Sequence, residues 1–511
     1  RIEAGVVYAL HQASNDGHTY LPRAALVEEA AKLLDVPAAL GEGAVERAAA
    51  AEMIYLDTLH VEGERVEAVY LPAYYFAERG LAARLRTLAR HPASRLERLQ
   101  HGDLDALMER LSAESDITLA PQQAGAVRAA LTHTLSVLTG GPGTGKTTTL
   151  RAIIRALELN RYRFALASPT GRAAKRLSEA TGHPAKTIHR LLGFAPGEGF
   201  AYGEEQPLPA DFVMIDEASM LDLLLAHSLV KAVAPGAHLL LVGDVDQLPS
   251  VGAGDVLRDV IKSGVAHVTR LDTIFRQEAG SYIIHNAHRI NQGLAPVFGE
   301  DATDFFLFAL SDPDPEKVAG WVVDIVQARI PERFGIAPGD IQVLVPMYRG
   351  PAGVNALNER LQAALNPPGR AAEKRLGGRT FRVGDRLMQT RNNYDKDVFN
   401  GDIGRLHAID AVNQILRLAF DDRFVDYDFS EADELVHAFA ISVHKSQGSE
   451  YPAVVVPLLT QHYMMLQRNL LYTAVTRAQR LVVLVGARRA IHIAVKNDKV
   501  SERYSGLAAR L

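Results

Sequence analysis

The chain has 511 residues, of which 48% are hydrophobic and 23% charged, and its formal net charge is −5. This length exceeds what one hydrophobic core supports and predicts three or four domains at ~150 residues each. The negative charge excludes a polycation, so a nucleic-acid partner would have to be bound by a local basic groove. The absence of cysteine excludes disulfides and thiolate zinc sites. Because no apolar run nears the ~20 residues of a membrane span and no signal peptide is visible, we expect a cytoplasmic protein with no membrane partner.

Residues 1–115 are predicted to form a mainly helical N-terminal domain. The stretches "GVVYALHQA" and "LPRAALVEEAAKLL" are typical of helices, and Pro22 suits a first helical turn. The alternating stretch "MIYLDTLHVEGERVEAVYL" turns at Glu62-Gly63-Glu64 and indicates a hairpin. Helices followed by a hairpin suggest a winged-helix-like module. A plain docking domain has the same element order, so its role stays open.

The remaining chain alternates short apolar strands with helical stretches, which predicts an α/β fold with two parallel-sheet domains. Residues 116–265 carry the first set of strands, including "LSVLTG" and "HLLLVGD". Residues 266–349 and 433–511 carry the second set, including "IQVLVPM" and "LVVLVG". Residues 350–432 interrupt the second set with short strands and an Asn400-Gly401 turn, which predicts an inserted small β-barrel.

A phosphate-binding loop is predicted at "LSVLTGGPGTGKTTTL". Gly140 is followed after four residues by Gly145-Lys146-Thr147, with a strand before the loop and a helix after it. Glycines let the backbone wrap phosphates, the helix N-terminus adds positive potential, Lys146 can reach the outer phosphates, and Thr147 can ligate Mg²⁺. This strand–loop–helix context favours a P-loop NTPase that uses ATP and Mg²⁺ over a glycine-rich turn.

Two acidic residues end the strand in "DFVMIDEAS". We expect Asp216 to hold Mg²⁺ through its water shell and Glu217 to polarise the attacking water. An exposed acidic strand end is the plain alternative, and the P-loop upstream argues against it.

Gln247 follows another strand, in "LLLVGDVDQLPSVG". That strand ends at the acidic pair Asp244 and Asp246, which we expect at the same sheet edge as Asp216. A glutamine there can hydrogen-bond the γ-phosphate of ATP or orient the lytic water. We therefore interpret Gln247 as a γ-phosphate sensor, with a bland loop glutamine as the alternative.

Two arginines are candidates for stabilising phosphoryl-transfer charge. Arg276 lies in "LDTIFRQ" and Arg477 in "LLYTAVTRAQR", both on or near the second α/β domain. Catalysis would then require the two domains to close on ATP, and hydrolysis would open and shut the cleft between them. This cycle indicates a motor.

Taken together and in order, these motifs resemble the RecD-like helicases of superfamily 1. The resemblance runs from about residue 119 to 486 and implies two RecA-like motor domains, a Src-homology-3-like barrel, ATP-dependent translocation on single-stranded DNA in the 5′→3′ direction, and unwinding at duplex junctions. The motifs that carry it are "GGPGTGKT", "SPTGRAAKRL", "TIHRLLG", "VMIDEASM", "GDVDQLPSVG", "IFRQ", "VHKSQGSE" and "YTAVTRA".

The same resemblance implies roles for further residues. Gln123 in "LAPQQAGAV" would read adenine, whose N6/N7 edge a glutamine amide can pair with. Beside Gln123, the expected ATP contacts are Gly141, Pro142, Gly143, Thr144, Gly145, Lys146, Thr147, Thr148, Gly448 and Glu450. The expected contacts to the DNA strand are Pro169, Thr170, Gly171, Thr187, His189, Ser442, His444 and Lys445.

A short hairpin is predicted within "GFAPGEGFAYGEEQPLPA", residues 193–210. Aromatic residues Phe194, Phe200 and Tyr202 flank a tip built from proline and glycine. The RecD-like pattern has a strand-separating hairpin at this place, and an ordinary connecting loop is the alternative. Tyr394 and Phe399 could stack on bases, but we expect them in the core of the inserted barrel.

Two rival functions remain open at this point. An RNA helicase of the same superfamily would share these motifs, since none of them reads the 2′-hydroxyl. A DNA-end-binding subunit of a nuclease complex could use ATP only as a latch. The combination of Glu217, Arg276 and Arg477 argues against a latch, because a latch needs no water activation.

Overall fold

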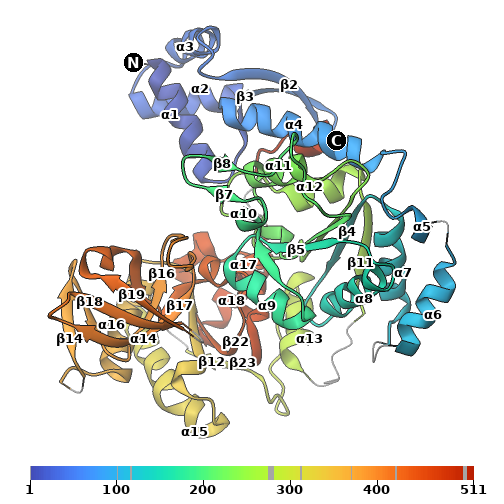
Figure 1. Ribbon diagram of the computed structural model, residues 1–511. Helices are drawn as coiled ribbons and strands as arrows, with labels where there is room; N and C mark the ends of the chain where they lie inside the picture. Colours follow the sequence, from blue (N-terminus) through green and yellow to red (C-terminus); the bar gives the residue numbers. More distant parts are fainter. Residues whose placement is uncertain are drawn as a thin grey trace.

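The structure is a computed structural model that describes residues 2–100, 102–114, 118–273, 281–310, 314–369, 371–420, 423–498 and 503–511. Two parallel sheets, each covered by helices, lie side by side beneath a helical N-terminal part (Figure 1). The α/β fold class expected from the sequence is therefore confirmed.

The first sheet has six parallel strands in the order β11-β4-β10-β9-β5-β6. Its central strands are apolar on both faces, so alternate residues enter two different cores. Leu239 and Leu241 pack with the helices of one face, and Leu240 and Val242 with those of the other. The strands are β4 (Leu135–Gly140), β5 (Phe164–Ser168), β6 (Ala185–Thr187), β9 (Phe212–Ile215), β10 (His238–Gly243) and β11 (His267–Leu271).

Helices cover both faces of this sheet, and together they form the first unit. Helices α4, α11 and α12 belong to the core of one face, and α5 to α8 to the core of the other. They are α4 (Pro72–Ala89), α5 (Glu97–Gln100), α6 (Leu104–Glu114), α7 (Pro121–Thr132), α8 (Lys146–Leu159), α9 (Gly171–Thr181), α10 (Ile188–Leu191), α11 (Leu223–Ala232) and α12 (Val256–Ser263).

The packing of the first unit extends beyond the range 116–265 that we expected for it. Helices α4 to α6 precede residue 116, yet their leucines pack against this sheet. Strand β11 follows residue 265 and pairs in parallel with β4 from His267 to Leu271. The place of α4 to α6 is not visible in local patterns, because a helix carries no signal of which sheet it joins, whereas the apolar stretch of β11 does continue the first set of strands.

The second unit is built on a parallel sheet of five strands in the order β12-β23-β22-β13-β21. Its strands are β12 (Phe305–Ala309), β13 (Ile341–Val345), β21 (Ala440–Ser442), β22 (Tyr451–Leu458) and β23 (Ala478–Gly486). Helices α13, α17 and α18 cover one face and α14 to α16 the other. They are α13 (Tyr282–Asn291), α14 (Pro315–Asp324), α15 (Ile330–Phe334), α16 (Val354–Leu365), α17 (Arg468–Thr476) and α18 (Arg488–Lys496).

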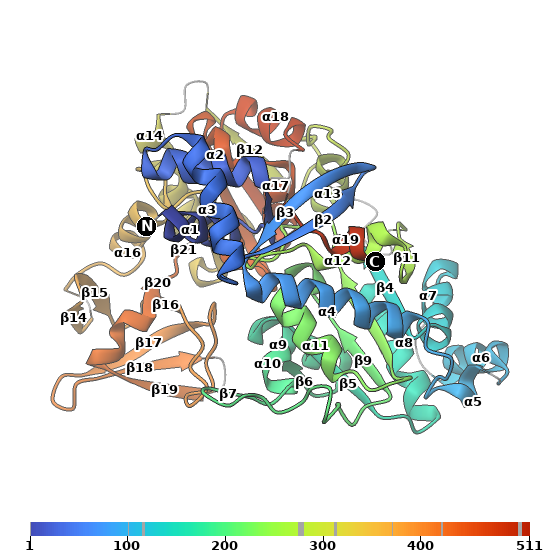
Figure 2. The same ribbon diagram turned by 90° about the horizontal axis from the view of Figure 1, so that it is seen from above.

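A small antiparallel β-unit is inserted between α16 and β21, and Figure 2 shows it beside β7 of the first unit. Its sheet order is β19-β18-β17-β16-β20, with the hairpin β14-β15 alongside. We expected this insertion to begin at residue 350, whereas α16 packs on the second sheet. The strands are β14 (Glu373–Leu376), β15 (Arg379–Arg382), β16 (Arg386–Gln389), β17 (Ile403–Asp410), β18 (Ile415–Phe420), β19 (Arg423–Asp428) and β20 (Leu435–His437).

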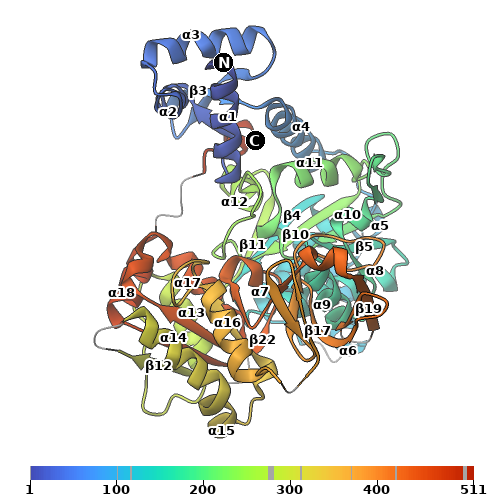
Figure 3. The same cartoon turned by 90° about the vertical axis from the view of Figure 1, so that its left-hand side faces the viewer.

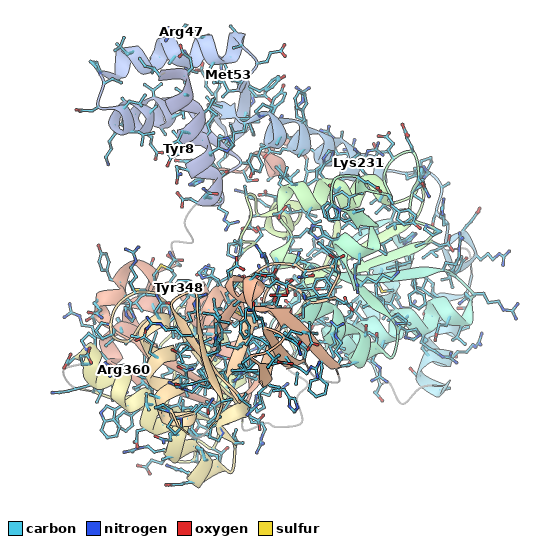
Figure 4. The ribbon with its side chains drawn as sticks, turned by 60° about the vertical axis from the view of Figure 1, so that its left-hand side comes forward. Tyr8, Arg47, Met53, Lys231, Tyr348 and Arg360 are labelled. Carbon is cyan, nitrogen blue, oxygen red and sulfur yellow. The ribbon has the colours of Figure 1, made fainter. Side chains whose placement is uncertain are left out.

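The N-terminal part has helices followed by a hairpin, the order expected of a winged-helix-like module. Its sheet order is β1-β3-β2, and Figure 4 shows Tyr8, Arg47 and Met53 on this part, away from the two sheets. Its elements are α1 (Ile2–Asn15), β1 (Tyr20–Pro22), α2 (Arg23–Leu34), α3 (Ala38–Ala50), β2 (Tyr55–Val61) and β3 (Glu64–Tyr70).

The C-terminal end of the chain returns to the first unit and the N-terminal part. Helix α19 (Leu507–Arg510) packs against α4, α12 and β2, and Figure 3 shows the C-terminus there, well away from α18. We had assigned residues up to 511 to the second unit, so this placement is a correction. Across the described ranges, no helix is both long enough and apolar enough to cross a membrane.

Candidate functional site

The P-loop lies between the end of β4 and the start of α8. Gly143 and Gly145 adopt φ values of 72° and 84°, a region that favours glycine, and they turn the chain around the N-terminus of α8. The Lys146 ammonium donates to the carbonyl oxygens of Gly140 and Gly141 at 2.6 and 2.9 Å. The Lys146 side chain thus lies against the backbone of the loop itself, while Thr147 at the start of α8 is exposed.

Gln123 lies beside this loop and is bonded to backbone at both ends of its amide. Its Oε1 accepts from the amide of Ala120 at 2.9 Å, and its Nε2 donates to the carbonyl of Gly145 at 3.5 Å. The side chain is buried. These two hydrogen bonds hold the start of α7 to the P-loop. To pair with adenine, the Gln123 amide would have to give them up.

Asp216 and Glu217 follow β9 at the same sheet edge as the P-loop. Glu217 has φ 53°, a left-handed conformation that is unusual for a residue other than glycine. Burial and the neighbouring Glu217 carboxylate raise the pKa of Asp216 to about 6, although the Lys146 and Arg176 cations oppose this rise. A carboxylate of that kind gains stability from any cation brought next to it.

Asp244 is a buried acceptor at the end of β10 and collects donors from both units. Gln247 Nε2 donates to Asp244 Oδ2 at 3.2 Å, and the Tyr472 hydroxyl of α17 donates to the same oxygen at 2.7 Å. Burial raises the pKa of Asp244 and of the Tyr472 phenol. Gln247 therefore lies where the two units meet, with its amide bonded to protein.

The surroundings of the P-loop fit the phosphates of a nucleotide. A Cβ added at Gly141 would lie 3.1 Å from the Tyr472 hydroxyl and 3.8 Å from Nε2 of His288, both from the second unit. His288 Nε2 is buried and has no hydrogen-bond partner among the described residues. An unpaired imidazole nitrogen beside loop amides and Lys146 suits an oxygen-rich anionic ligand.

The structure describes only one of the two candidate arginines. Arg276 lies outside the described residues. Arg477 is buried, and its guanidinium donates to the carbonyl oxygens of Thr473 and Ser449 at 3.3 and 3.2 Å. It thus braces the segment that carries Gly448 and Glu450.

Two arginines of α9, in the first unit, form hydrogen bonds with residues 448–451 of the second unit. Arg172 donates to the hydroxyls of Ser449 and Tyr451 at 2.9 and 3.3 Å. One turn later, Arg176 donates to the carbonyl of Gly448 at 3.2 Å and pairs with Glu450 at 3.1 Å. The same Arg176 nitrogen lies 3.9 Å from Glu217. Arg176 therefore joins the candidate water-activating carboxylate to the second unit.

The expected DNA contacts lie at helix starts and strand ends on both units. Thr170 caps α9 and Thr187 caps α10, each accepting a backbone amide of its helix, while Pro169 and Gly171 flank the first cap. His189 lies in α10 against the hairpin, and burial lowers its pKa.

On the second unit, Ser442 lies 3.2 Å from the hydroxyl of Tyr348, which Figure 4 shows at the surface of that unit. Lys445 donates to Asn400 of the β-unit at 2.7 Å, and burial lowers the pKa of Lys445 and of His444.

A cleft of about 890 Å³ is lined by α9, α10, the β-unit and the 448–451 segment. Gly171, Thr187 and Phe399 line it. Cations outnumber carboxylates on its walls, so it is a candidate for the local basic groove that a nucleic-acid partner of this acidic chain would need. The basic lining residues are Arg172, Lys175, Arg176, Lys186, Arg190, Arg386, Arg405 and Arg423, and the acidic ones are Glu179, Asp397, Asp402 and Glu450.

The hairpin at residues 193–210 is present as β7 (Phe194–Ala195) and β8 (Gly199–Phe200). The Phe194 and Phe200 rings are 5.2 Å apart, and Phe194 lies 5.9 Å from Tyr394 of the β-unit. Tyr202 donates its amide to Leu192 and packs on the core of the first unit.

Our expectation for Tyr394 and Phe399 was wrong. Neither belongs to the core of the β-unit, and both are partly exposed. Phe399 instead covers Gly171, where an added Cβ would meet its ring at 2.7 Å.

Sequence reasoning missed several contributors to the site. Arg172, Arg176 and Tyr472 lie within the quoted motifs, but their partners include groups of the other unit, which leave no local signal. His288 lies in none of the motifs that the sequence analysis identified. The arginines of β16, β17 and β19 were also missed, since each looks like an ordinary exposed strand residue until the cleft is assembled.

Family models match three segments of the chain. An AAA domain matches residues 123–253, the SH3 domain of ATP-dependent RecD-like DNA helicases matches 357–420, and a UvrD-like helicase C-terminal domain matches 437–485. The three matches correspond to the first unit, the β-unit with part of α16, and the motif-bearing part of the second unit.

Similar proteins cover most of the chain. The chain is 36% identical over 505 residues to the ATP-dependent RecD2 DNA helicase of Deinococcus radiodurans, covering 98% of this chain and 67% of that protein. It is 34% identical over 435 residues to the RecBCD enzyme subunit RecD of Mycobacterium tuberculosis, covering 76% of this chain and 73% of that one. Among solved structures, Bacteroides Pif1 bound to single-stranded DNA overlaps with a TM-score of 0.44 and 18% identity, over 72% of this chain and 92% of that chain.

Proposed function

The chain belongs to the RecD-like family of ATP-dependent DNA helicases, and from this premise we propose that it moves along single-stranded DNA, in the 5′→3′ direction, and separates duplex DNA ahead of it. The observation that carries the proposal is the meeting of the two units at one point. Lys146 and Glu217 come from the first unit, Tyr472 and Glu450 from the second, and Arg176 and Asp244 bond across the gap. A site shared in this way changes shape when ATP is bound and hydrolysed.

The first unit would bind the phosphates of ATP. Thr148 belongs to the first turn of α8, where the unpaired amides of a helix start and the helix dipole favour negative charge. Lys146 would exchange the carbonyl oxygens of Gly140 and Gly141 for phosphate oxygens. His288 would supply a hydrogen bond from the second unit, because its Nε2 is buried beside Gly141 without a partner among the described residues.

Thr147 and Asp216 would hold Mg²⁺, which when bound neutralises phosphate charge during phosphoryl transfer. The raised pKa of Asp216 supports this assignment, since burial disfavours its charge until a cation is present. Glu217 is placed one residue further on and would accept the proton of the attacking water. Its carboxylate lies 3.9 Å from the Arg176 guanidinium.

Closure of the units would complete catalysis. Arg477 holds the 448–451 segment from within the second unit, and Arg176 holds it from the first. Arg276, from the family's pattern, would supply the second cation for the transferring phosphoryl group. Gln247 would leave Asp244 and bond the γ-phosphate, so that its loop reports which nucleotide is present.

The DNA strand would run along the basic cleft between α9, α10 and the β-unit. Thr170 and Thr187 at the two helix starts would face its phosphates, and Lys445 would meet them from the second unit. Phe399 lines the cleft, and Tyr394 lies beside it with the ring centroids 6.0 Å apart; both rings are partly exposed and offer stacking surfaces for bases. The Phe194–Phe200 hairpin would stand where the duplex splits.

ATP hydrolysis tests the proposal when measured with single-stranded DNA, with single-stranded RNA and with neither. We expect strong stimulation by DNA, and unwinding of duplexes with a 5′ single-stranded tail but not a 3′ tail. Equal stimulation by RNA would favour the RNA helicase alternative. Unwinding from a 3′ tail would refute the direction.

A further inference from the structure

The loop that follows Gln247 is bonded at its beginning to the second unit. The amide of Leu248 donates to the Thr473 hydroxyl at 2.9 Å, and Gln447 Nε2 donates to the carbonyl of Leu248 at 2.7 Å. Leu248 itself is buried in the core of the second unit. Leu248, the residue after Gln247, is therefore held between two groups of the second unit. A movement of Gln247 changes the conformation of the loop at this point.

The other end of the same loop is held by Arg503, far away in sequence. One guanidinium nitrogen donates to the carbonyl oxygens of Gly252 and Gly254 at 3.1 and 2.7 Å and to the Ser250 hydroxyl at 3.2 Å. The other donates to the carbonyl of Ser250 at 2.6 Å. A rigid, planar group with several donors fixes the shape of a loop better than a lysine can.

The N-terminal part contacts both the loop and the segment that carries Arg503. The amide of Gly254 donates to the carbonyl of Gly17 at 2.9 Å, in the turn between α1 and β1. Two residues on, the amide of Thr19 donates to the carbonyl of Tyr504 at 2.8 Å, and the Tyr504 amide donates to His18 at 3.0 Å. Three segments distant in sequence thus share one hydrogen-bonded junction.

Residues 503–511, which we name the C-terminal strap, are anchored beyond this junction. The amide of Gly506 donates to the buried carboxylate of Glu78 at 2.9 Å, and Arg510 pairs with Glu78 at 2.9 Å and with Asp57 at 2.8 Å. Ser505 donates to Asp259 of α12 at 2.5 Å. Because Asp57 lies in β2 and Glu78 in α4, the strap ties the N-terminal part to the first unit.

We propose that Arg503 is a positioning residue that couples the nucleotide-sensing loop at residues 247–254 to the docking of the N-terminal part. This proposal rests on the proposed function, in which Gln247 bonds the γ-phosphate of ATP. When Gln247 exchanges Asp244 for a phosphate, the loop shifts between its two anchors, and Arg503 passes the shift to the strap and to the turn at Gly17. The N-terminal part thereby acquires a docking strength that depends on the nucleotide.

Hydrogen exchange at the junction tests this coupling in the intact chain. The amides of Thr19 and Gly254 are bonded across it, so their exchange rates report its opening. With Mg²⁺ and a non-hydrolysable ATP analogue, we expect both rates to change by about fivefold or more, the lower end of typical coupling between sites. In R503Q the analogue should leave the two rates unchanged. No change in the wild-type chain, or a change of wild-type size in R503Q, would overturn the proposal.

Two further variants separate coupling from loss of structure. R503K keeps the charge but loses the planar set of donors, and we expect a folded protein with a reduced response to the analogue. K262Q removes the exposed Lys262–Glu62 pair, which joins α12 to the β2–β3 turn without touching the loop. It should respond like the wild type, and a lost response in K262Q would show that any weakened docking has the same effect.

ATP hydrolysis measured on the same samples separates this proposal from the proposed function. If the wild-type chain shows no DNA-stimulated hydrolysis, the proposed function fails and the coupling fails with it. If hydrolysis is stimulated but exchange at Thr19 and Gly254 ignores the nucleotide, only the coupling is refuted.

Discussion

The hydroxyl of Tyr472 donates a hydrogen bond of 2.7 Å to the carboxylate of Asp244, and this bond joins α17 of the second unit to the end of β10 in the first. The same carboxylate oxygen accepts the amide of Gln247 at 3.2 Å. Because both donors share one buried acceptor, a movement of either changes the contact of the other. The side chain that we propose as the nucleotide sensor and the interface between the units thus belong to one network.

Q247A and Y472F should therefore weaken the same coupling. A hydrogen bond to a charged group contributes about 1.5–3 kcal/mol, so each variant should reduce the difference between DNA affinities measured with and without a non-hydrolysable ATP analogue. Because the residues share Asp244, the double variant should lose less than the sum of the single losses. Y463F, at a tyrosine that is 63% exposed, should behave like the wild type. An unchanged affinity difference in Q247A would make Gln247 an ordinary loop residue.

K146A and E217Q should both strongly reduce ATP turnover, but for different reasons. Lys146 is the cation at the mouth of the P-loop, so its loss should weaken ATP binding and reduce the rate by about two to three orders of magnitude. E217Q keeps every phosphate contact and should still bind ATP, which equilibrium binding of a fluorescent analogue can measure. A K146A variant that retains DNA-stimulated hydrolysis would place the reaction elsewhere.

R176Q should reduce DNA-stimulated turnover about 10-fold to 100-fold, the range expected when a catalytic group is misplaced. Arg176 is the cation between Glu217 and Glu450, and it also opposes the rise in the pKa of Asp216. Its loss should shift the acid limb of the pH–rate profile to higher pH. R172Q is the matched control, because Arg172 grips the same segment without touching a carboxylate of the ATP site. An equal shift in both variants would indicate a general effect of the interface.

The apparent affinity for Mg²⁺ should fall as the pH decreases through about 6. Burial and Glu217 raise the pKa of Asp216 to about 6, so protonation competes with the metal in that range rather than near the usual value of about 4. The free energy of unfolding depends on pH in the opposite direction from the Mg²⁺ affinity and decreases as the pH rises. A raised pKa means that the folded state holds the proton more tightly, and folding stability is lost as the pH rises through the folded pKa. Without Mg²⁺ at pH 8, D216N should therefore melt at a higher temperature than the wild type, although it is inactive.

Replacing residues 194–202 by a short Gly-Ser turn should separate unwinding from translocation. The hairpin packs its Phe194 and Phe200 rings on each other and on His189, and Phe194 lies 5.9 Å from Tyr394 of the β-unit. Each base-pair step opened costs ~1.4 kcal/mol of stacking, so a rigid obstacle to one strand matters more than a single contact. We expect near wild-type DNA-stimulated hydrolysis with unwinding abolished. Intact unwinding would move strand separation to the N-terminal part or the β-unit.

The sequence alone determined the parts of this site that are local in the chain. The P-loop needs only a strand, a run with glycines at Gly143 and Gly145, and a helix start, and all of these are neighbours in sequence. Asp216, Glu217 and Gln247 could be placed at one sheet edge for the same reason, since parallel strands end on the same side. The hairpin at Phe194 also follows from residues next to one another.

Only the tertiary structure decided which side chains from distant segments meet. Arg176 pairs with Glu450, which lies 274 positions further along the chain. The two residues belong to motifs that fold onto different sheets. No local sequence pattern predicts that Tyr472 bonds Asp244 or that Arg503 bonds the loop at Ser250. The pairing of long-range polar groups depends on how two cores settle against each other, and that packing is a property of the whole fold rather than of any stretch of it.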